Sequence, residues 1–108
     1  LFRPRADLAE AARRDLAGAL TVALTEIPSV RRARVGRRVT HGRPYESLMR
    51  VHYEYAALLE FDDLEGLQAY LTHPAHDVLA ARFFAAFEEA LMYDYELEEG
   101  AGAIARLL

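Results

Sequence analysis

The spacing of apolar residues changes along the first third of the chain from a helical to an extended pattern. Apolar side chains recur at steps of three and four over residues 7–27, which predicts an amphipathic helix. Asp7 is expected to cap this helix, with Glu10 in the capping-box position, and Pro28 is expected to end it. Residues 30–39 then alternate between apolar and arginine side chains, which predicts a strand at an edge of a sheet.

The middle of the chain contains turn residues followed by a continuous apolar run. Residues 40–53 include glycine and proline, and we expect a loop there with a short helix that starts at Pro44. Residues 55–61 are apolar at both odd and even positions, which is typical of a strand covered on both faces. A helix is predicted to follow, with Asp62 or Asp63 as its cap.

The last third of the chain predicts one more helix and one more strand. A helix is expected over residues 75–90, and its inward side chains are Leu79, Phe83, Phe84 and Phe87. Residues 91–97 alternate, which predicts a strand with Leu91, Tyr93, Tyr95 and Leu97 on one face. Residues 98–108 are interpreted as a tail. Residues 1–3 are interpreted as the end of a first strand that starts before Leu1.

This order of elements predicts an α+β fold of the ferredoxin-like type, an antiparallel four-stranded sheet with its helices on one face. The other face would remain uncovered, and its area of about 350 Å² is near the largest apolar patch that monomers expose. We therefore expect a homodimer whose two sheets enclose a dimeric α+β barrel. The arginine strand and the strand with Asp94 and Glu96 are the expected edges, and their charges either pair across subunits or are solvated.

Composition restricts the classes of partner. The chain has 108 residues, 53% of them hydrophobic, with a net charge of −4, which is typical of one ordinary globular domain and argues against nucleic acid as a partner. Without cysteine, neither thiolate catalysis nor a cysteine-ligated metal is available. No apolar run is long enough to span a membrane, and we predict a cytoplasmic protein.

Three stretches carry a resemblance to a known family: "EIPSVRRARVGRRV", "LLEFDDLEGLQAYLTHPAH" and "YDYEL". Over residues 1–97 the chain resembles the stress-responsive dimeric α/β-barrel (Dabb) domain. The resemblance implies the two-sheet dimer. Most of the family has no assigned reaction, but a plant polyketide cyclase of the family closes a ring by aldol condensation. By resemblance to that enzyme, His76 is the general base and Tyr70 the hydroxyl that orients the substrate.

Pro74 gives an independent reason to expect these two side chains together. A continuous helix would place residues six apart about 120° away from one another, whereas Pro74 forces a break between Tyr70 and His76. A neutral imidazole abstracts acidic protons, and a phenol donates to a developing oxyanion, so the pair suits enolate chemistry. The alternative is that His73 and His76 bond backbone groups freed by Pro74 while Tyr70 only packs.

Other candidate residues follow from position. His73, Phe83, Tyr93 and Tyr95 are candidate ligand-binding residues, although core packing is the alternative for the aromatic ones. His41 and His52 could add to His73 and His76 in a metal site, but no ligand spacing fixes their geometry, so neither metal nor cofactor is predicted. The arginine cluster of residues 31–38 lacks interleaved aromatics and is not expected to bind nucleic acid.

The sequence therefore predicts a dimeric barrel protein that binds a small, partly apolar molecule. If the protein is an enzyme, it is a cofactor-independent cyclase or isomerase that uses the His76 and Tyr70 pair for proton transfer. The alternative is a non-catalytic structural or ligand-binding module of a stress response.

Overall fold

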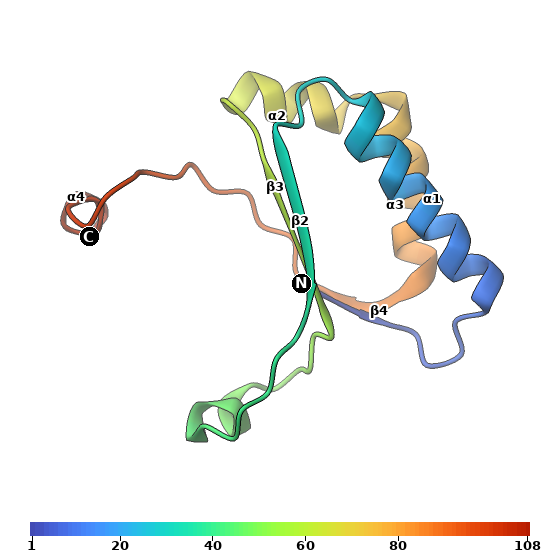
Figure 1. The fold of residues 1–108 in the computed structure, drawn as a ribbon, viewed down its shortest axis with the longest axis horizontal. Coiled ribbons are helices and arrows are strands. Elements are labelled where there is room, and N and C mark those ends of the chain that lie inside the picture. Colours follow the sequence, from blue (N-terminus) through green and yellow to red (C-terminus); the bar gives the residue numbers. More distant parts are fainter.

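Four antiparallel strands form one sheet, and three helices pack on one side of it (Figure 1). The computed structural model describes all 108 residues. The elements are β1 (Phe2–Pro4), α1 (Glu10–Glu26), β2 (Arg32–Arg37), the 3-10 helix η1 (Pro44–Leu48), β3 (Tyr55–Glu60), α2 (Leu64–Leu71), α3 (Pro74–Ala86), β4 (Phe87–Ala90) and α4 (Ala103–Leu107). The strand order β2-β3-β1-β4 confirms the predicted ferredoxin-like sheet, with β2 at an edge.

The first helix starts later than its apolar pattern suggests. Its N-cap is Ala9, which makes no side-chain hydrogen bond, so the predicted capping box of Asp7 and Glu10 is wrong. Asp7 lies instead in a turn that the Leu8 N–H closes by donating to the carbonyl of Arg5. This turn redirects the chain from β1, and the helix begins only after it. The second predicted cap is confirmed, because Asp63 accepts a hydrogen bond from the N–H of Gly66.

The last strand lies earlier in the chain than its alternating pattern predicts. The helix predicted over residues 75–90 ends at Ala86, and the strand predicted over 91–97 lies instead at Phe87–Ala90. Phe87 is the helix C-cap with extended backbone, and its buried ring packs against the rings of Phe2 and Phe83. Pairing with β1 thus begins as soon as the helix stops. No strand lies beside residues 92–97, so their alternation has no ladder to join.

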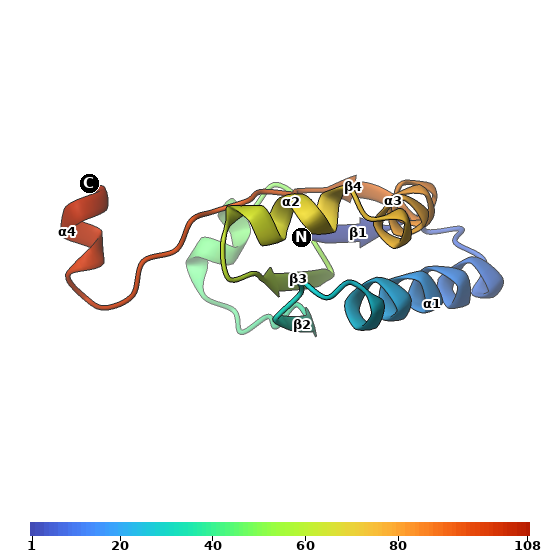
Figure 2. The ribbon, with the colours of Figure 1, turned by 90° about the horizontal axis from the view of Figure 1, so that it is seen from above.

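The core lies between the three helices and the sheet. It is small: only seven of the 108 residues are buried, and four of these form one cluster, Ala23, Ile27, Tyr70 and Leu79. Helix α1 packs along α3, and α2 covers the end of the pair (Figures 1 and 2). None of the helices combines the length and the apolar composition that a membrane span requires.

The outer face of the sheet, opposite the helices, carries charge as well as apolar surface. Leu59 packs against the core, so Leu58 and Glu60 on either side of it point outward. Glu60 pairs there with Arg34 at 2.8 Å and with Arg32 at 3.8 Å. The face is therefore less apolar than residues 55–61 suggest, and these two arginines of β2 have an acidic partner within their own sheet.

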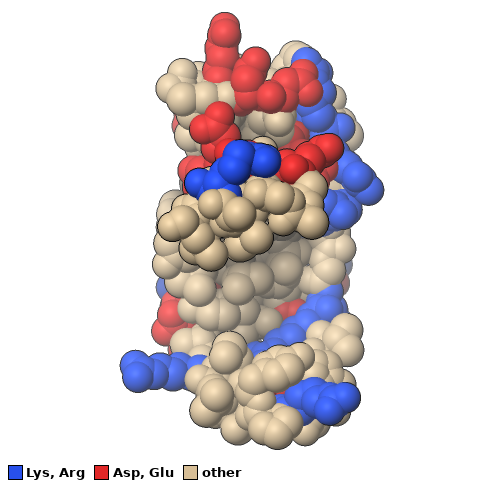
Figure 3. Space-filling model, turned by 90° about the vertical axis from the view of Figure 1, so that its left-hand side faces the viewer, with Lys and Arg blue, Asp and Glu red and all other residues tan.

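Residues 91–108 form a C-terminal arm that extends away from the rest of the chain (Figures 1 and 2). Helix α4 at its end is tied back by an ion pair of 2.7 Å between Arg106 and Glu98. The radius of gyration is 16.0 Å, whereas a compact domain of this length has about 13 Å. Eight large apolar side chains of the arm are exposed: Leu91, Met92, Tyr93, Tyr95, Leu97, Ile104, Leu107 and Leu108. Figure 3 shows the side of the molecule on which the arm lies, and uncharged surface dominates its middle.

Candidate functional site

The break between α2 and α3 brings Tyr70 and His76 into contact. Pro74 occupies the start of α3, where its missing N–H costs no helical hydrogen bond, and His73 before it is extended. Tyr70, in the last turn of α2, and His76, in the first turn of α3, then meet with ring centroids 4.7 Å apart in an edge-to-face arrangement. The sequence predicted this contact, and its geometry is the one that aromatic rings prefer.

His73 has a structural task in this break. Its Nδ1 accepts a hydrogen bond of 3.0 Å from the N–H of Ala75 and so caps α3. When the ring is neutral, its proton is therefore on Nε2. This is one of the bonds that the structural alternative proposed for the histidines on either side of Pro74.

Tyr70 sits in an environment that suppresses the charged form of its side chain. Burial, and after it the negative charge of Asp94, raises the pKa of the Tyr70 phenol, so the side chain remains a neutral hydrogen-bond donor. Tyr70 is only 8% exposed, and its ring also packs against the ring of Phe61. The Nδ1 of His76 is buried and has no hydrogen-bond partner. An imidazole nitrogen without a hydrogen-bond partner, next to a phenol, combines the two kinds of group that general acid–base catalysis uses.

A cavity with a largely apolar lining lies elsewhere, between α1 and the sheet. It has a volume of about 470 Å³, and nine of its 13 lining residues are hydrophobic. The lining residues are Phe2, Pro4, Leu8, Arg13, Leu16, Ala17, Leu20, Val35, Gly36, Arg37, Tyr55, Ala56 and Phe87. Neither Tyr70 nor His76 is among them. We call this space the α1–sheet cavity.

Phe83 supports this cavity from behind and does not line it. Its ring packs against Phe2 at 5.3 Å and against Phe87 at 4.4 Å, and both of these residues reach the cavity wall. Tyr93 and Tyr95 belong to the C-terminal arm, where their rings are exposed and lie 6.2 Å apart. Neither tyrosine lines the α1–sheet cavity.

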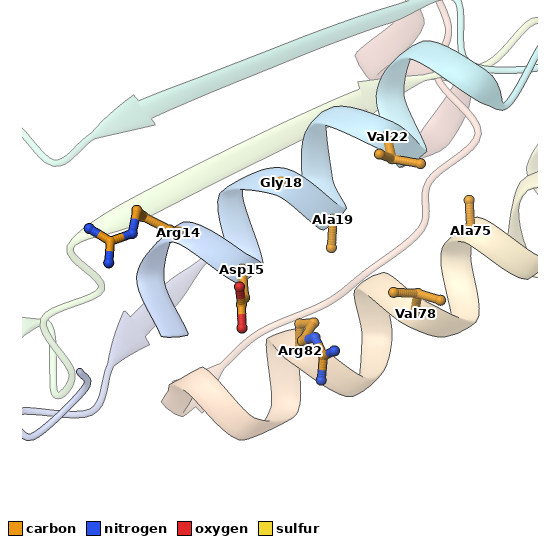
Figure 4. A pocket seen from close by; sticks show the side chains of 8 residues that line it. All are labelled: Arg14, Asp15, Gly18, Ala19, Val22, Ala75, Val78 and Arg82. Atoms are coloured by element: carbon orange, nitrogen blue, oxygen red, sulfur yellow. The ribbon is translucent and has the colours of Figure 1, made fainter. Parts of the chain in front are cut away.

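A second hollow of about 400 Å³ runs between α1 and α3 on the outer side of the helices (Figure 4). Small residues, Gly18, Ala19 and Ala75, form part of its wall, and Val22 and Val78 stand at one end. Arg14, Asp15 and Arg82 stand at the other end (Figure 4). Both charge signs are present in it, so it offers no single preference to a ligand.

The two histidines of the loop, His41 and His52, contact different residues. His41 Nε2 lies 2.7 Å from the hydroxyl of Tyr45, whereas His52 Nδ1 lies 3.1 Å from Arg38 Nη1. The carboxylate of Glu46 accepts hydrogen bonds from the backbone N–H groups of His41 and Gly42, and these bonds lower the Glu46 pKa. No group of three acidic or histidine side chains gathers in a way that could hold a metal ion.

The α1–sheet cavity was not identified from the sequence. The only sequence signal is that three of its lining residues are small: Ala17 on α1, Gly36 on β2 and Ala56 on β3. Small side chains on opposing elements leave volume that nothing else fills. Their juxtaposition depends on the strand register, in which Gly36 pairs with Ala56, and this register follows from no local pattern.

The sequence pattern that defines the stress responsive A/B barrel domain matches residues 1–97. The chain belongs to this family. No protein of curated function matches the chain.

Solved structures share the Dabb fold across almost the whole chain. A crystal structure of an Arabidopsis thaliana protein superposes with a TM-score of 0.73 at 18% identity, covering 94% of this chain and 93% of the other. A dimeric ferredoxin-like protein of unknown function from Jannaschia has a TM-score of 0.67 at 24% identity, covering 90% and 93%. A dimeric protein of the same description from Bacteroides fragilis gives 0.60 and 24%, covering 90% of each chain. At these identities the likeness establishes the fold alone.

Proposed function

We propose that this Dabb protein is a homodimer that binds a small, partly apolar molecule in the α1–sheet cavity. The observation that supports binding most directly is the cavity itself. Its volume of about 470 Å³ lies in the usual range for small-molecule sites, and most of its wall is hydrophobic. A largely apolar space that opens to water is unfavourable when hydrated, so an apolar ligand gains free energy by displacing that water.

Filling the cavity with a side chain tests this proposal. Ala17→Trp places an indole into the wall of the cavity, whereas Ala11→Trp makes the same change at an exposed position of α1 that does not line it. The probe is phenylnaphthylamine, an uncharged dye that fluoresces in apolar surroundings. We expect the parent protein and Ala11→Trp to bind the dye and Ala17→Trp to lose at least tenfold in affinity. Equal binding by all three proteins would contradict the proposed site.

The C-terminal arm supports the homodimer. It exposes eight large apolar side chains, and monomers rarely leave large contiguous apolar patches uncovered. A second copy of the chain is the most economical cover, because a symmetric pair buries both arms at once. The dimeric solved relatives share the fold on which such a pair would be built.

The dimer is tested by sedimentation at micromolar concentration. The parent chain of 12.2 kDa should sediment at twice that mass. Leu97→Glu places a charge on the arm and should shift the protein toward the monomer. Leu64→Glu is the matched control, because Leu64 is similarly exposed (67%, against 73% for Leu97) but lies on α2, away from the arm. Dissociation by the control alone would contradict the role of the arm.

A second candidate function is proton transfer, favoured by the unpartnered Nδ1 of His76 beside Tyr70. In this role His76 removes an acidic proton from carbon and Tyr70 donates to the developing enolate oxygen, as in a cyclase or isomerase. Deuterium exchange at the acidic carbon of a simple β-diketone, followed by NMR, tests the chemistry. His76→Gln should abolish catalysed exchange, and no acceleration by the parent protein leaves the non-catalytic binding module as the function.

A cytoplasmic location stays a prediction.

A further inference from the structure

The charged residues that line the α1–sheet cavity are all of one sign. Arg13 from α1 and Arg37 from β2 are the only charged residues in its wall, and no acidic residue lines it. The chain as a whole has 17 acidic against 13 basic residues. An exclusively cationic lining in an acidic protein therefore marks this cavity off from the rest of the surface, including the hollow between α1 and α3, which holds Asp15.

The two arginines have donors to spare. Arg13 makes no ion pair and no side-chain hydrogen bond, whereas the next residue, Arg14, pairs with Glu10 at 3.6 Å. Arg37 donates one N–H to the hydroxyl of Tyr55 at 3.1 Å, and its Nε lies 3.8 Å from the Glu54 carboxylate. A guanidinium has five N–H donors, so several remain on each arginine.

Tyr55 adds a third donor at the same place. Its hydroxyl oxygen accepts the hydrogen bond from Arg37, which leaves its own hydrogen free to donate. The Arg37 guanidinium also lies over the Tyr55 ring, 5.4 Å from its centroid, and this contact holds the guanidinium at the cavity wall. The polar edge of the cavity thus consists of hydrogen-bond donors, next to an apolar wall formed by residues such as Leu16, Leu20 and Val35.

We propose that the ligand of this cavity is a small amphipathic carboxylate, with its apolar tail against α1 and its carboxylate on Arg13 and Arg37. This inference rests on the proposed binding function and names the ligand class. A carboxylate accepts from a guanidinium through two parallel hydrogen bonds, so it matches these donors in shape as well as in charge. The apolar wall excludes strongly hydrated anions such as inorganic phosphate as complete occupants, because they would leave it unfilled.

A pair of ligands that differ only in charge tests the inference. Octanoate and octanol share the same tail length, and each is measured by its displacement of phenylnaphthylamine. We expect octanoate to bind roughly tenfold more tightly than octanol, and this preference to shrink in high salt because the arginines are exposed. Arg13→Gln should remove most of the preference by weakening octanoate while leaving octanol unchanged.

Arg14→Gln is the matched control, since Arg14 is adjacent on α1 but lines the other hollow (Figure 4). It should keep the full preference for octanoate. If both variants lose it equally, the effect is that of general charge and the inference is overturned. If the parent binds both ligands equally well, the carboxylate class is wrong while the cavity remains a binding site. If neither ligand nor the dye binds, the proposed function itself fails.

Discussion

The ring of His76 meets the ring of Tyr70 edge to face, with their centroids 4.7 Å apart, across a helix break made by Pro74. The contact joins the end of α2 to the start of α3, and Tyr70 is one of the four residues of the main core cluster. The same pair therefore has a packing role whatever chemistry it performs. The α1–sheet cavity is a separate feature, so ligand binding can be tested on residues other than Tyr70 and His76.

His76→Ala should lower the free energy of unfolding by about 1–2 kcal/mol, because it removes a half-buried ring and its aromatic contact. Urea denaturation measures the loss. Binding of phenylnaphthylamine should persist, since His76 does not line the α1–sheet cavity. Loss of dye binding without a change in stability would show that the two regions are coupled.

His73→Ala should cost about 1 kcal/mol, because the N–H of Ala75 at the start of α3 loses its acceptor. His73→Asp should restore most of the stability, since aspartate is a preferred N-cap and its charge favours the helix N-terminus. Thermal or urea unfolding of the two variants distinguishes a capping role from any other. If both variants are equally destabilised, the side chain of His73 acts by something other than capping.

Tyr70 should make stability fall at high pH. Its pKa is raised above the ordinary value of 10.0, first by burial and then by Asp94. The unfolded chain loses this proton at a lower pH than the folded chain, so it binds fewer protons and the free energy of unfolding decreases as pH rises. The stabilisation is complete below pH 10 and disappears as pH passes through the folded pKa.

Unfolding measurements at increasing alkaline pH should show a shallower decline in Tyr70→Phe than in the parent. Asp94→Asn removes only the second cause of the shift, so it should change the decline less than Tyr70→Phe does. An identical decline in the parent and Tyr70→Phe would mean that Tyr70 does not contribute to it.

The order of the loop that contains His41 and Gly42 should depend on pH through the ionisation of Glu46. The backbone N–H of His41 is the main cause of the lowered pKa of Glu46, with a further contribution from the N–H of Gly42. A lowered pKa gives stability that is present above the unfolded pKa and is lost as pH falls through the folded value. The amide NMR signals of His41 and Gly42 should therefore move at a pH below the usual range of glutamate. Glu46→Gln should remove this transition, and its persistence would assign it to another group.

Local patterns were sufficient for most of the elements. The period of three to four residues identified α1, the period of two identified β2, and Pro44 correctly started η1. The caps were less predictable, because Asp7 has the right chemistry but is used by a turn, whereas Asp63 is used as a cap. Such a choice depends on where the chain must go next, which a single cap sequence does not encode.

The last strand shows why alternation is insufficient. Residues 91–97 alternate better than residues 87–90, yet only the latter pair with β1. A strand exists through its neighbour's hydrogen bonds, and β1 lies beside residues 87–90 because Phe87 packs onto Phe2. Register is a long-range property, so the pattern could predict a strand but not its place.

The sequence by itself determined the helices α1, α2 and α3, the ferredoxin-like order of elements and the meeting of Tyr70 with His76, because periodicity and a single proline act over a few residues. Only the tertiary structure decided the position of β4, the outward arm and the α1–sheet cavity with Arg13 and Arg37. These features arise where segments far apart in the chain are brought together, and the volume left between them depends on packing that no local pattern contains.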